Sequence, residues 1–140
     1  AIRHCDPDAI GFNCALGAEH LKPHLHSLNN ISDKPISLHP NAGLPNEMGG
    51  YDESPEYMSS IIREIAEEGL FNLVGGCCGT TPEHLAAMNE ALVDHVPRTF
   101  PEIDDVIERL GPVTLGTRAY CEGTAPIAVS RPRRRRRKAD

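Results

Sequence analysis

The chain has 140 residues, 39% of them hydrophobic and 24% charged, which matches one soluble domain at most. Residues 131–138 hold seven of the 14 lysines and arginines and leave residues 1–130 with 7 basic against 19 acidic side chains, so the net charge of −6 conceals an asymmetry. An acidic body gives no support to nucleic-acid binding. No apolar run approaches the ~20 residues of a membrane span. Neither nucleic acid nor a membrane is therefore expected as a partner.

The five cysteines indicate free thiols rather than disulfides. Their number is odd, and their spacing is not that of a small secreted disulfide scaffold. Residues 1–6 also lack the basic-then-apolar order of a signal peptide. We therefore expect a reducing, cytoplasmic setting. The chain has no initiator Met and opens in mid-pattern, as if cut from something longer.

The first predicted strand covers residues 9–13 and ends at Cys14 and Gly17. A helical pattern follows, with apolar residues at spacings of four, three and three: Leu21, Leu25, Leu28 and Ile31. Residues 35–39 are predicted to form the second strand. The segment at 40–45, Pro-Asn-Ala-Gly-Leu-Pro, is not expected to continue a ladder, because proline cannot donate a hydrogen bond.

The clearest helix begins at residues 54–56, where a capping serine, a first-turn proline and a first-turn acid stand in the expected order. Gly69 ends it, and its apolar face consists of Met58, Ile61, Ile62, Ile65 and Ala66. Residues 71–74 are the third predicted strand. A third helix starts in the same style at residues 81–83, with the apolar stripe Leu85, Met88, Leu92 and Val93. After Pro97 the periodicity fades, which indicates a linker.

Strand and helix alternate three times, which implies parallel strands joined by crossover helices. A doubly wound sheet and a (β/α)8 barrel both fit this order. No Gly-x-Gly-x-x-Gly or P-loop pattern follows a strand, which weakens a nucleotide-binding version. In a barrel, catalytic residues come from the C-terminal ends of several strands. Cys14, Asn41 and the Cys77-Cys78 pair follow the three predicted strands in turn.

Residues 73–82, Leu-Val-Gly-Gly-Cys-Cys-Gly-Thr-Thr-Pro, are predicted to run from a strand through a turn into a helix. Neighbouring side chains on a strand point to opposite faces, so Gly75, Gly76 and Gly79 are expected to give the backbone freedom that aims both sulfurs at one point. A disulfide between adjacent cysteines is disfavoured, because their Cα atoms are ~3.8 Å apart and bridged cysteines prefer ~5.5–6 Å. The pair suggests a soft metal, above all zinc. The alternative is two buried free thiols.

Cys14 supplies a third thiol, and three cysteine ligands with one open position are the pattern of a catalytic zinc site. Cys5 lies before the first strand and Cys121 in the tail, so both are poor candidates for a fourth ligand. Zinc bound by three thiolates is negatively charged and is suited to holding an exogenous thiol as its thiolate. The sequence therefore points to thiol alkylation rather than hydrolysis.

Three motifs closely resemble the homocysteine S-methyltransferase family. They are residues 11–14 (Gly-Phe-Asn-Cys), 39–46 (His-Pro-Asn-Ala-Gly-Leu-Pro-Asn) and 75–80 (Gly-Gly-Cys-Cys-Gly-Thr), in family order and at family spacing. The middle motif, with the Tyr51-Asp52 that follows, looks most like that of the cobalamin-dependent methionine synthases.

The resemblance implies a (β/α)8 barrel in which Cys14, Cys77 and Cys78 bind zinc, zinc binds homocysteine as a thiolate, and the thiolate takes a methyl group to give methionine. In the cobalamin enzymes the donor is methylcobalamin on a separate module, and a folate-binding module follows the barrel. Betaine and S-methylmethionine are the alternative donors. Asn41 is a tentative substrate-binding residue, through the amino acid group of homocysteine or through zinc's open position; the alternative is a turn former before Gly43.

The family's barrel needs about 250 residues, so this chain is expected to be a fragment with the last three strand-helix units only. We assign residues 1–96 to the C-terminal part of the barrel, 97–116 to an inter-domain linker and 117–140 to an atypical, disordered basic tail. The chain alone is not expected to turn over, and a catalytically inert zinc-binding remnant is the alternative. His39 is interpreted as a packed strand residue and His84 as a solvent-facing one.

Overall fold

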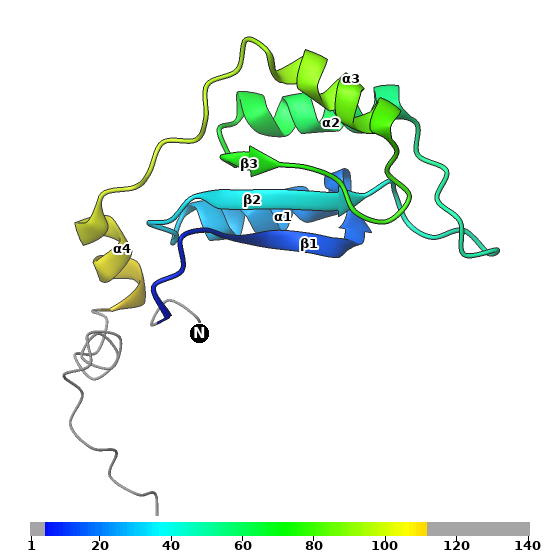
Figure 1. The fold of residues 1–140 in the computed structure, drawn as a ribbon. Helices are drawn as coiled ribbons and strands as arrows, with labels where there is room; N and C mark the ends of the chain where they lie inside the picture. Colours follow the sequence, from blue (N-terminus) through cyan, green and yellow to red (C-terminus); the bar gives the residue numbers. More distant parts are fainter. Residues whose placement is uncertain (1–4, 112–140) are drawn as a thin grey trace, which may run out of the picture. The chain divides into compact units, whose positions relative to one another are not determined.

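The structure, a computed structural model, describes residues 5–111 (Figure 1). Its elements, in chain order, are β1 (Ile10–Gly17), α1 (Ala18–Asn29), β2 (Ile36–Asn41), α2 (Pro55–Glu67), β3 (Leu73–Val74), α3 (Pro82–Leu92) and α4 (Ile103–Leu110). The three predicted strand-helix units are confirmed. The predicted basic tail at 117–140 lies outside the described residues, as does the end of the predicted linker.

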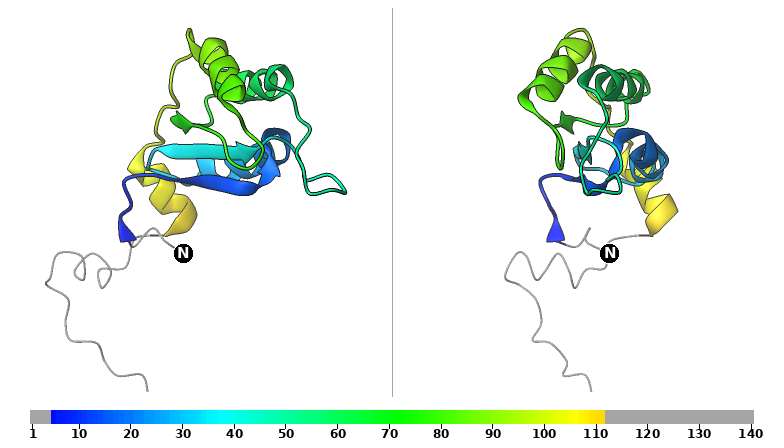
Figure 2. Two further views of the ribbon diagram at one scale, coloured as in Figure 1. Left: turned by 45° about the vertical axis from the view of Figure 1, so that its right-hand side comes forward. Right: turned by 90° about the vertical axis from the view of Figure 1, so that its right-hand side faces the viewer.

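The three strands form one parallel sheet in the order β1-β2-β3. Phe12 pairs with Leu38, and Leu38 pairs with Val74 on its other side. The helix α1 lies against β1 and β2, and α2 and α3 lie side by side (Figure 1 and Figure 2). Because the strands are parallel, their C-terminal ends share one edge of the sheet. The sequence predicts that Cys14, Cys77 and Cys78 lie at this edge.

The core is centred on β2, whose Ile36 and Leu38 are fully buried. The helices pack their predicted apolar faces against it. The largest of these buried side chains are Leu21, Leu25, Met58, Ile62, Ile65 and Met88. Full burial of one such side chain stabilises a fold by about 1.5–3 kcal/mol relative to exposure. This cluster therefore fixes the helices to the sheet and the sheet edge in place.

The predicted apolar stripe of α3 is buried only in part. Met88 is buried and Leu92 partly buried, whereas Leu85 is 48% and Val93 73% exposed. Within the described residues α3 packs on α2 along one side and follows the last strand of an open sheet. One side of its stripe therefore has no described element to cover it.

The strand β2 runs further than predicted, through Pro40 to Asn41. The expectation that the proline segment leaves the ladder is wrong. Proline lacks an N–H, but the Pro40 carbonyl accepts a hydrogen bond from Cys77 N at 2.8 Å. Asn41 pairs with Gly17 of β1. The end of β2 is thus bonded to β1 on one side and to the cysteine turn after β3 on the other.

The segment predicted as a linker, residues 97–116, contains a helix in its described part. α4 fully buries Val106, while Ile107 and Leu110 stay 36% and 48% exposed. The helix has eight residues, which is too short for a hydrophobic period to stand out in the sequence. A hydrogen bond from Arg109 Nη1 to Asn30 O at 3.0 Å ties the helix to the residue that follows α1.

Arg98 anchors the chain before α4. Its side chain is buried, with only 3% of the residue exposed. The guanidinium donates to Asn29 Oδ1 and to the carbonyl oxygens of Asn29 (3.1 Å), Ser32 (2.6 Å) and Lys34 (3.2 Å). These acceptors belong to the C-terminal end of α1 and the turn before β2. Sequence reasoning missed this anchor because every acceptor is 64 to 69 residues away.

The described residues therefore form an α/β unit with a three-stranded parallel sheet, compatible with part of a (β/α)8 barrel. Between residues 5 and 111 the sheet stays open and no closed barrel forms. No helix in this range is both long and apolar enough to cross a membrane.

Replacing Arg98 by Met should lower the free energy of unfolding by about 2–4 kcal/mol, because several buried carbonyls lose a charged donor. Replacing Arg109 by Met is the matched control, since its single bond to Asn30 O is at an exposed site, and should change stability by less than about 0.5 kcal/mol. Urea unfolding of the two variants measures both effects. Equal losses would contradict the anchoring role of Arg98.

Candidate metal centre

Cys14 lies in an irregular part of β1. Between Asn13 and Gly17 the strand β1 advances four residues while its partner β2 advances two. Cys14 and Ala15 have φ angles of +69° and +68°, which non-glycine residues rarely adopt. Bulges of this kind bend a strand and re-aim its side chains, and strained backbone clusters at functional sites. The predicted strand end at Cys14 is therefore a bulge inside a longer strand.

The Cys77-Cys78 turn continues the parallel ladder beyond β3. Cys77 N donates to Pro40 O at 2.8 Å, and Ala42 N donates to Cys78 O at 2.9 Å. Thr80 closes the turn, because its N–H (3.2 Å) and its hydroxyl (2.7 Å) both donate to Cys77 O. Backbone hydrogen bonds thus hold both cysteines at the C-terminal edge of the sheet, just before α3.

The three glycines of the turn act mainly through the space that they leave. A Cβ on Gly75 would lie 2.7 Å from His39 Cδ2, and one on Gly76 would lie 2.4 Å from the hydroxyl oxygen that closes the turn. A Cβ on Gly79 would lie 2.3 Å from Tyr51 Cβ. Only Gly79 among them has a positive φ, +77°. The predicted conformational freedom is therefore used at Gly79, whereas Gly75 and Gly76 permit close packing, in one case against the half-buried His39.

The sulfurs of Cys14, Cys77 and Cys78 converge. The Sγ–Sγ distance is 3.6 Å from Cys14 to Cys78 and 3.9 Å from Cys77 to Cys78, and all three sulfurs lie within 4.8 Å of one another. Zinc–sulfur bonds of about 2.3 Å in a tetrahedron place two sulfurs about 3.8 Å apart. The three donors therefore fit one zinc ion with a fourth position left for another ligand. Cys5 is free and exposed, and Cys121 lies outside the described residues.

The three thiols are not electrostatically equivalent. The pKa of Cys14 is lowered, first by a hydrogen bond from the Ala15 backbone and then by the thiols of Cys78 and Cys77. The pKa of Cys77 is raised, first by a hydrogen bond with the Cys14 thiol, then by burial and by a hydrogen bond with the Cys78 thiol. Cys14 is thus the first of these two thiols to become a thiolate, which is the form that binds a metal.

Asn41 supports the cysteine turn. It is the last residue of β2, is 2% exposed, and its Oδ1 accepts a hydrogen bond from Cys78 N at 3.1 Å. It also contributes to the lowered pKa of Cys14 through a side-chain hydrogen bond. These contacts give Asn41 a structural task that neither the substrate-binding interpretation nor the turn-former interpretation contained.

His84 is buried, so the prediction that it faces solvent is wrong. It is 5% exposed, and its Nδ1 accepts from Thr81 N at 3.2 Å. With Nδ1 as the acceptor, Nε2 carries the proton and donates to Glu53 O at 2.9 Å. The bond to Thr81 resembles the returning side chain of a capping box, a pattern that its third position in the helix could have indicated. The bond to Glu53, 31 residues away, has no sequence signal.

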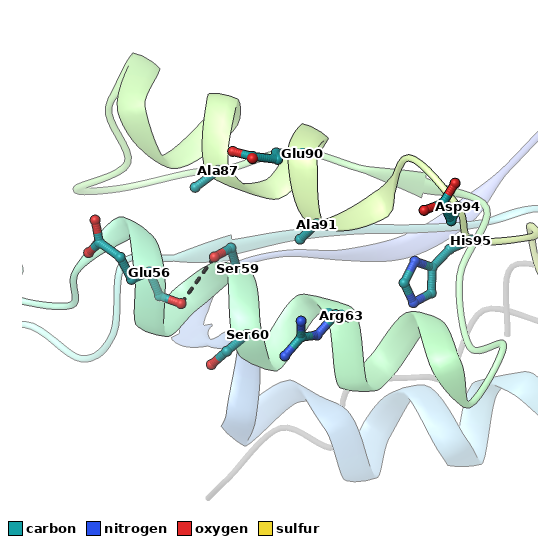
Figure 3. Close-up of a pocket in the computed structure, with 9 residues that line it drawn as sticks. All are labelled: Glu56, Ser59, Ser60, Arg63, Ala87, Glu90, Ala91, Asp94 and His95. Carbon is teal, nitrogen blue, oxygen red and sulfur yellow. Dashed lines mark hydrogen bonds between the residues drawn. The ribbon is translucent and has the colours of Figure 1, made fainter.

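A separate groove of about 650 Å³ lies between α2 and α3 (Figure 3). Its lining is small and charged, and none of the cysteines contributes to it. Ser59 Oγ donates to Glu56 O at 3.0 Å, and Arg63 Nε lies 4.0 Å from Glu67 Oε1. The side chains of Ser59 and Arg63 thus interact within α2 itself. Among the described residues, the cluster of possible metal ligands is that of the three cysteines at the edge of the sheet.

Residues 1–92 match the family model of homocysteine S-methyltransferase. The match covers more than half of the chain and contains all three cysteines of the cluster and Asn41. It ends with α3, so it takes in the whole sheet and its crossover helices. The chain therefore belongs to the homocysteine S-methyltransferase family.

Proposed function

We propose that Cys14, Cys77 and Cys78 hold a zinc ion on which homocysteine binds and is methylated to methionine. The observation that carries the proposal is the convergence of three sulfurs within 4.8 Å of one another, two of the distances being 3.6 and 3.9 Å, in a chain of this family. Bound there, zinc would keep the substrate's thiol as an electron-rich thiolate at neutral pH.

The chain's own residues prepare this chemistry in two ways. The bulge at Cys14 and the ladder at Cys77 hold the three donors close together. A metal held by three protein thiolates would favour binding of a substrate sulfur at its remaining position over activation of a bound water for hydrolysis. The substrate sulfur supplies the electron pair of the new S–C bond, and the pair of the broken bond leaves with the methyl donor.

Methylcobalamin on a separate module is the proposed methyl donor. Support comes from residues 39–46 and the following Tyr51-Asp52, which look most like the cobalamin-dependent branch of the family. Betaine and S-methylmethionine are the donors in the competing version. Asn41 is also proposed to face the substrate's amino acid group, because it stands at the sheet edge beside the cysteines.

The first prediction concerns zinc affinity. Replacing Cys14, Cys77 or Cys78 singly by Ser should weaken zinc binding at least about 100-fold, since each removes a ligand. Replacing the exposed Cys5 by Ser is the matched control and should leave the affinity unchanged. Competition against a chromophoric chelator measures both. Full affinity in the Cys14 variant, or an equal loss in the Cys5 variant, would refute the site.

The second prediction concerns the substrate's proton. Homocysteine binding to the zinc-loaded chain should release close to one proton at pH 7, because a free thiol of pKa ~8.5 is bound as a thiolate. Calorimetry in two buffers of different ionisation enthalpy measures the release. Homoserine, with a hydroxyl in place of the thiol, should release none. Binding of homocysteine without proton release would count against thiolate coordination, and no binding at all would favour an inert zinc-binding remnant.

A further inference from the structure

The described helices pack against one face of the sheet and leave the other face open. Leu38 of β2 is fully buried in the core, and the ring centroid of Phe12 in β1 lies 6.0 Å from that of His24 in α1. Because neighbouring side chains on a strand point to opposite faces, Asn13 and His39 point away from this core. Asn13 is exposed and His39 is half-buried. We call the side of the sheet that carries Asn13 and His39 the open face.

Asn13 and His39 lie next to the cysteine cluster on the open face. They are Cα partners in the parallel register of β1 and β2. Cys14 follows Asn13 directly, and Asn41 follows His39 by two residues, so that it returns to the same face. Two residues of a strand advance about 6.6 Å. His39 is therefore one pleat away from Asn41, whose Oδ1 accepts the hydrogen bond from Cys78 N.

The ring of His39 leans over the backbone that leads into the cysteine turn. A Cβ on Gly75 would lie 2.7 Å from His39 Cδ2 and 3.0 Å from its Nε2. Gly75 N donates to Leu38 O at 3.0 Å, so this backbone is bonded to β2 at the same level. Gly75 stands two residues before Cys77. The missing side chain at Gly75 thus leaves the space that the imidazole occupies beside the turn.

The ring of His39 offers hydrogen-bonding groups that the described part of the protein does not use. Neither ring nitrogen has a hydrogen-bond partner within residues 5–111, and neither is among the buried unpaired atoms of this range, so both stay accessible. His84 differs, because Thr81 N donates to its Nδ1 and its Nε2 donates to Glu53 O. An imidazole carries at least one N–H in either protonation state. His39 therefore has a donor available on the open face.

We propose that His39 is a substrate-binding residue, which donates a hydrogen bond to the carboxylate of homocysteine while the sulfur of the substrate is at the cysteine cluster. This inference rests on the proposed function. A short carbon chain separates the sulfur of homocysteine from its carboxylate and is long enough to reach one pleat along β2. Asn41 at the nearer level is only 2% exposed and already bonded to Cys78 N. The exposed amide of Asn13 lies beside His39 as a second polar group for the amino acid end of the substrate.

The test measures the binding of three thiols to the full 140-residue chain loaded with zinc. They are homocysteine, 4-mercaptobutanoate, which lacks the amino group, and 3-mercaptopropylamine, which lacks the carboxylate. His39→Leu should weaken binding of the first two roughly tenfold, as expected for loss of one hydrogen bond to a charged group. Binding of 3-mercaptopropylamine and of zinc itself should stay unchanged. Calorimetry measures the thiol affinities, and competition with a chelator measures the zinc affinity.

Two further variants separate hydrogen bonding from packing. His39→Gln keeps an N–H donor in the side chain and should restore most of the affinity for homocysteine. His24→Leu is the matched control, because His24 is exposed on α1 and contacts Phe12 on the helix-covered side of the sheet. This control should change the affinity for none of the three thiols.

Nuclear magnetic resonance of the unmodified chain with ¹⁵N-labelled histidine is a second measurement, which does not depend on the folding of a variant. The ring resonances of His39 are identified by their absence from the spectrum of His39→Leu. They should shift when homocysteine or 4-mercaptobutanoate is added, and much less when 3-mercaptopropylamine is added. Equal shifts with all three thiols would contradict a bond between His39 and the carboxylate.

An equal loss of affinity for all three thiols in His39→Leu would overturn the inference, because the ring would then act only by packing beside the cysteine turn. Unchanged affinity for homocysteine in that variant would overturn it as well. Both results would leave the metal site intact. If none of the three thiols bound to the unmodified zinc-loaded chain, the proposed function would fail and this inference with it.

Discussion

The structure depends on one geometric constraint, which is that sulfurs 64 residues apart in the chain must reach a spacing of 3.6 Å. A regular strand would not meet it, and β1 instead carries a bulge with Cys14 and Ala15 at positive φ. Left-handed backbone costs an L-residue about 1–2 kcal/mol. Metal binding that occurs only in the folded state offsets such a strain, because its free energy is added to that of folding.

The surroundings of the cysteines follow from the same constraint. Asn41 accepts from Cys78 N, and the loop after β2 returns to the turn through Glu53 and His84. Each of these polar groups is tied to the backbone, so the fold itself holds the cysteine turn at the edge of the sheet. Preorganised donors are what a site needs if its open position is to accept one incoming thiol in a fixed direction.

Local patterns in the sequence predicted the elements well, because the signals for them are local. The cap at Ser54 is one case, with its hydroxyl accepting from Tyr57 N at 3.3 Å. The family motifs and the order of the strands predicted that Cys14 lies close to the Cys77-Cys78 turn. What failed was non-local: Pro40 stays in the sheet through its carbonyl, His84 is buried by a bond to Glu53, and Arg98 is held by carbonyls at the far end of α1. A pattern of neighbouring residues in the sequence cannot indicate hydrogen-bond partners that lie far away along the chain.

X-ray absorption at the zinc K edge tests the central claim most directly, because it counts the sulfurs around the metal. For the zinc-loaded chain we expect three sulfur neighbours at about 2.3 Å and one lighter atom. Adding homocysteine should replace the lighter atom by a fourth sulfur. A shell of nitrogen and oxygen alone, or a shell that homocysteine leaves unchanged, would contradict the account.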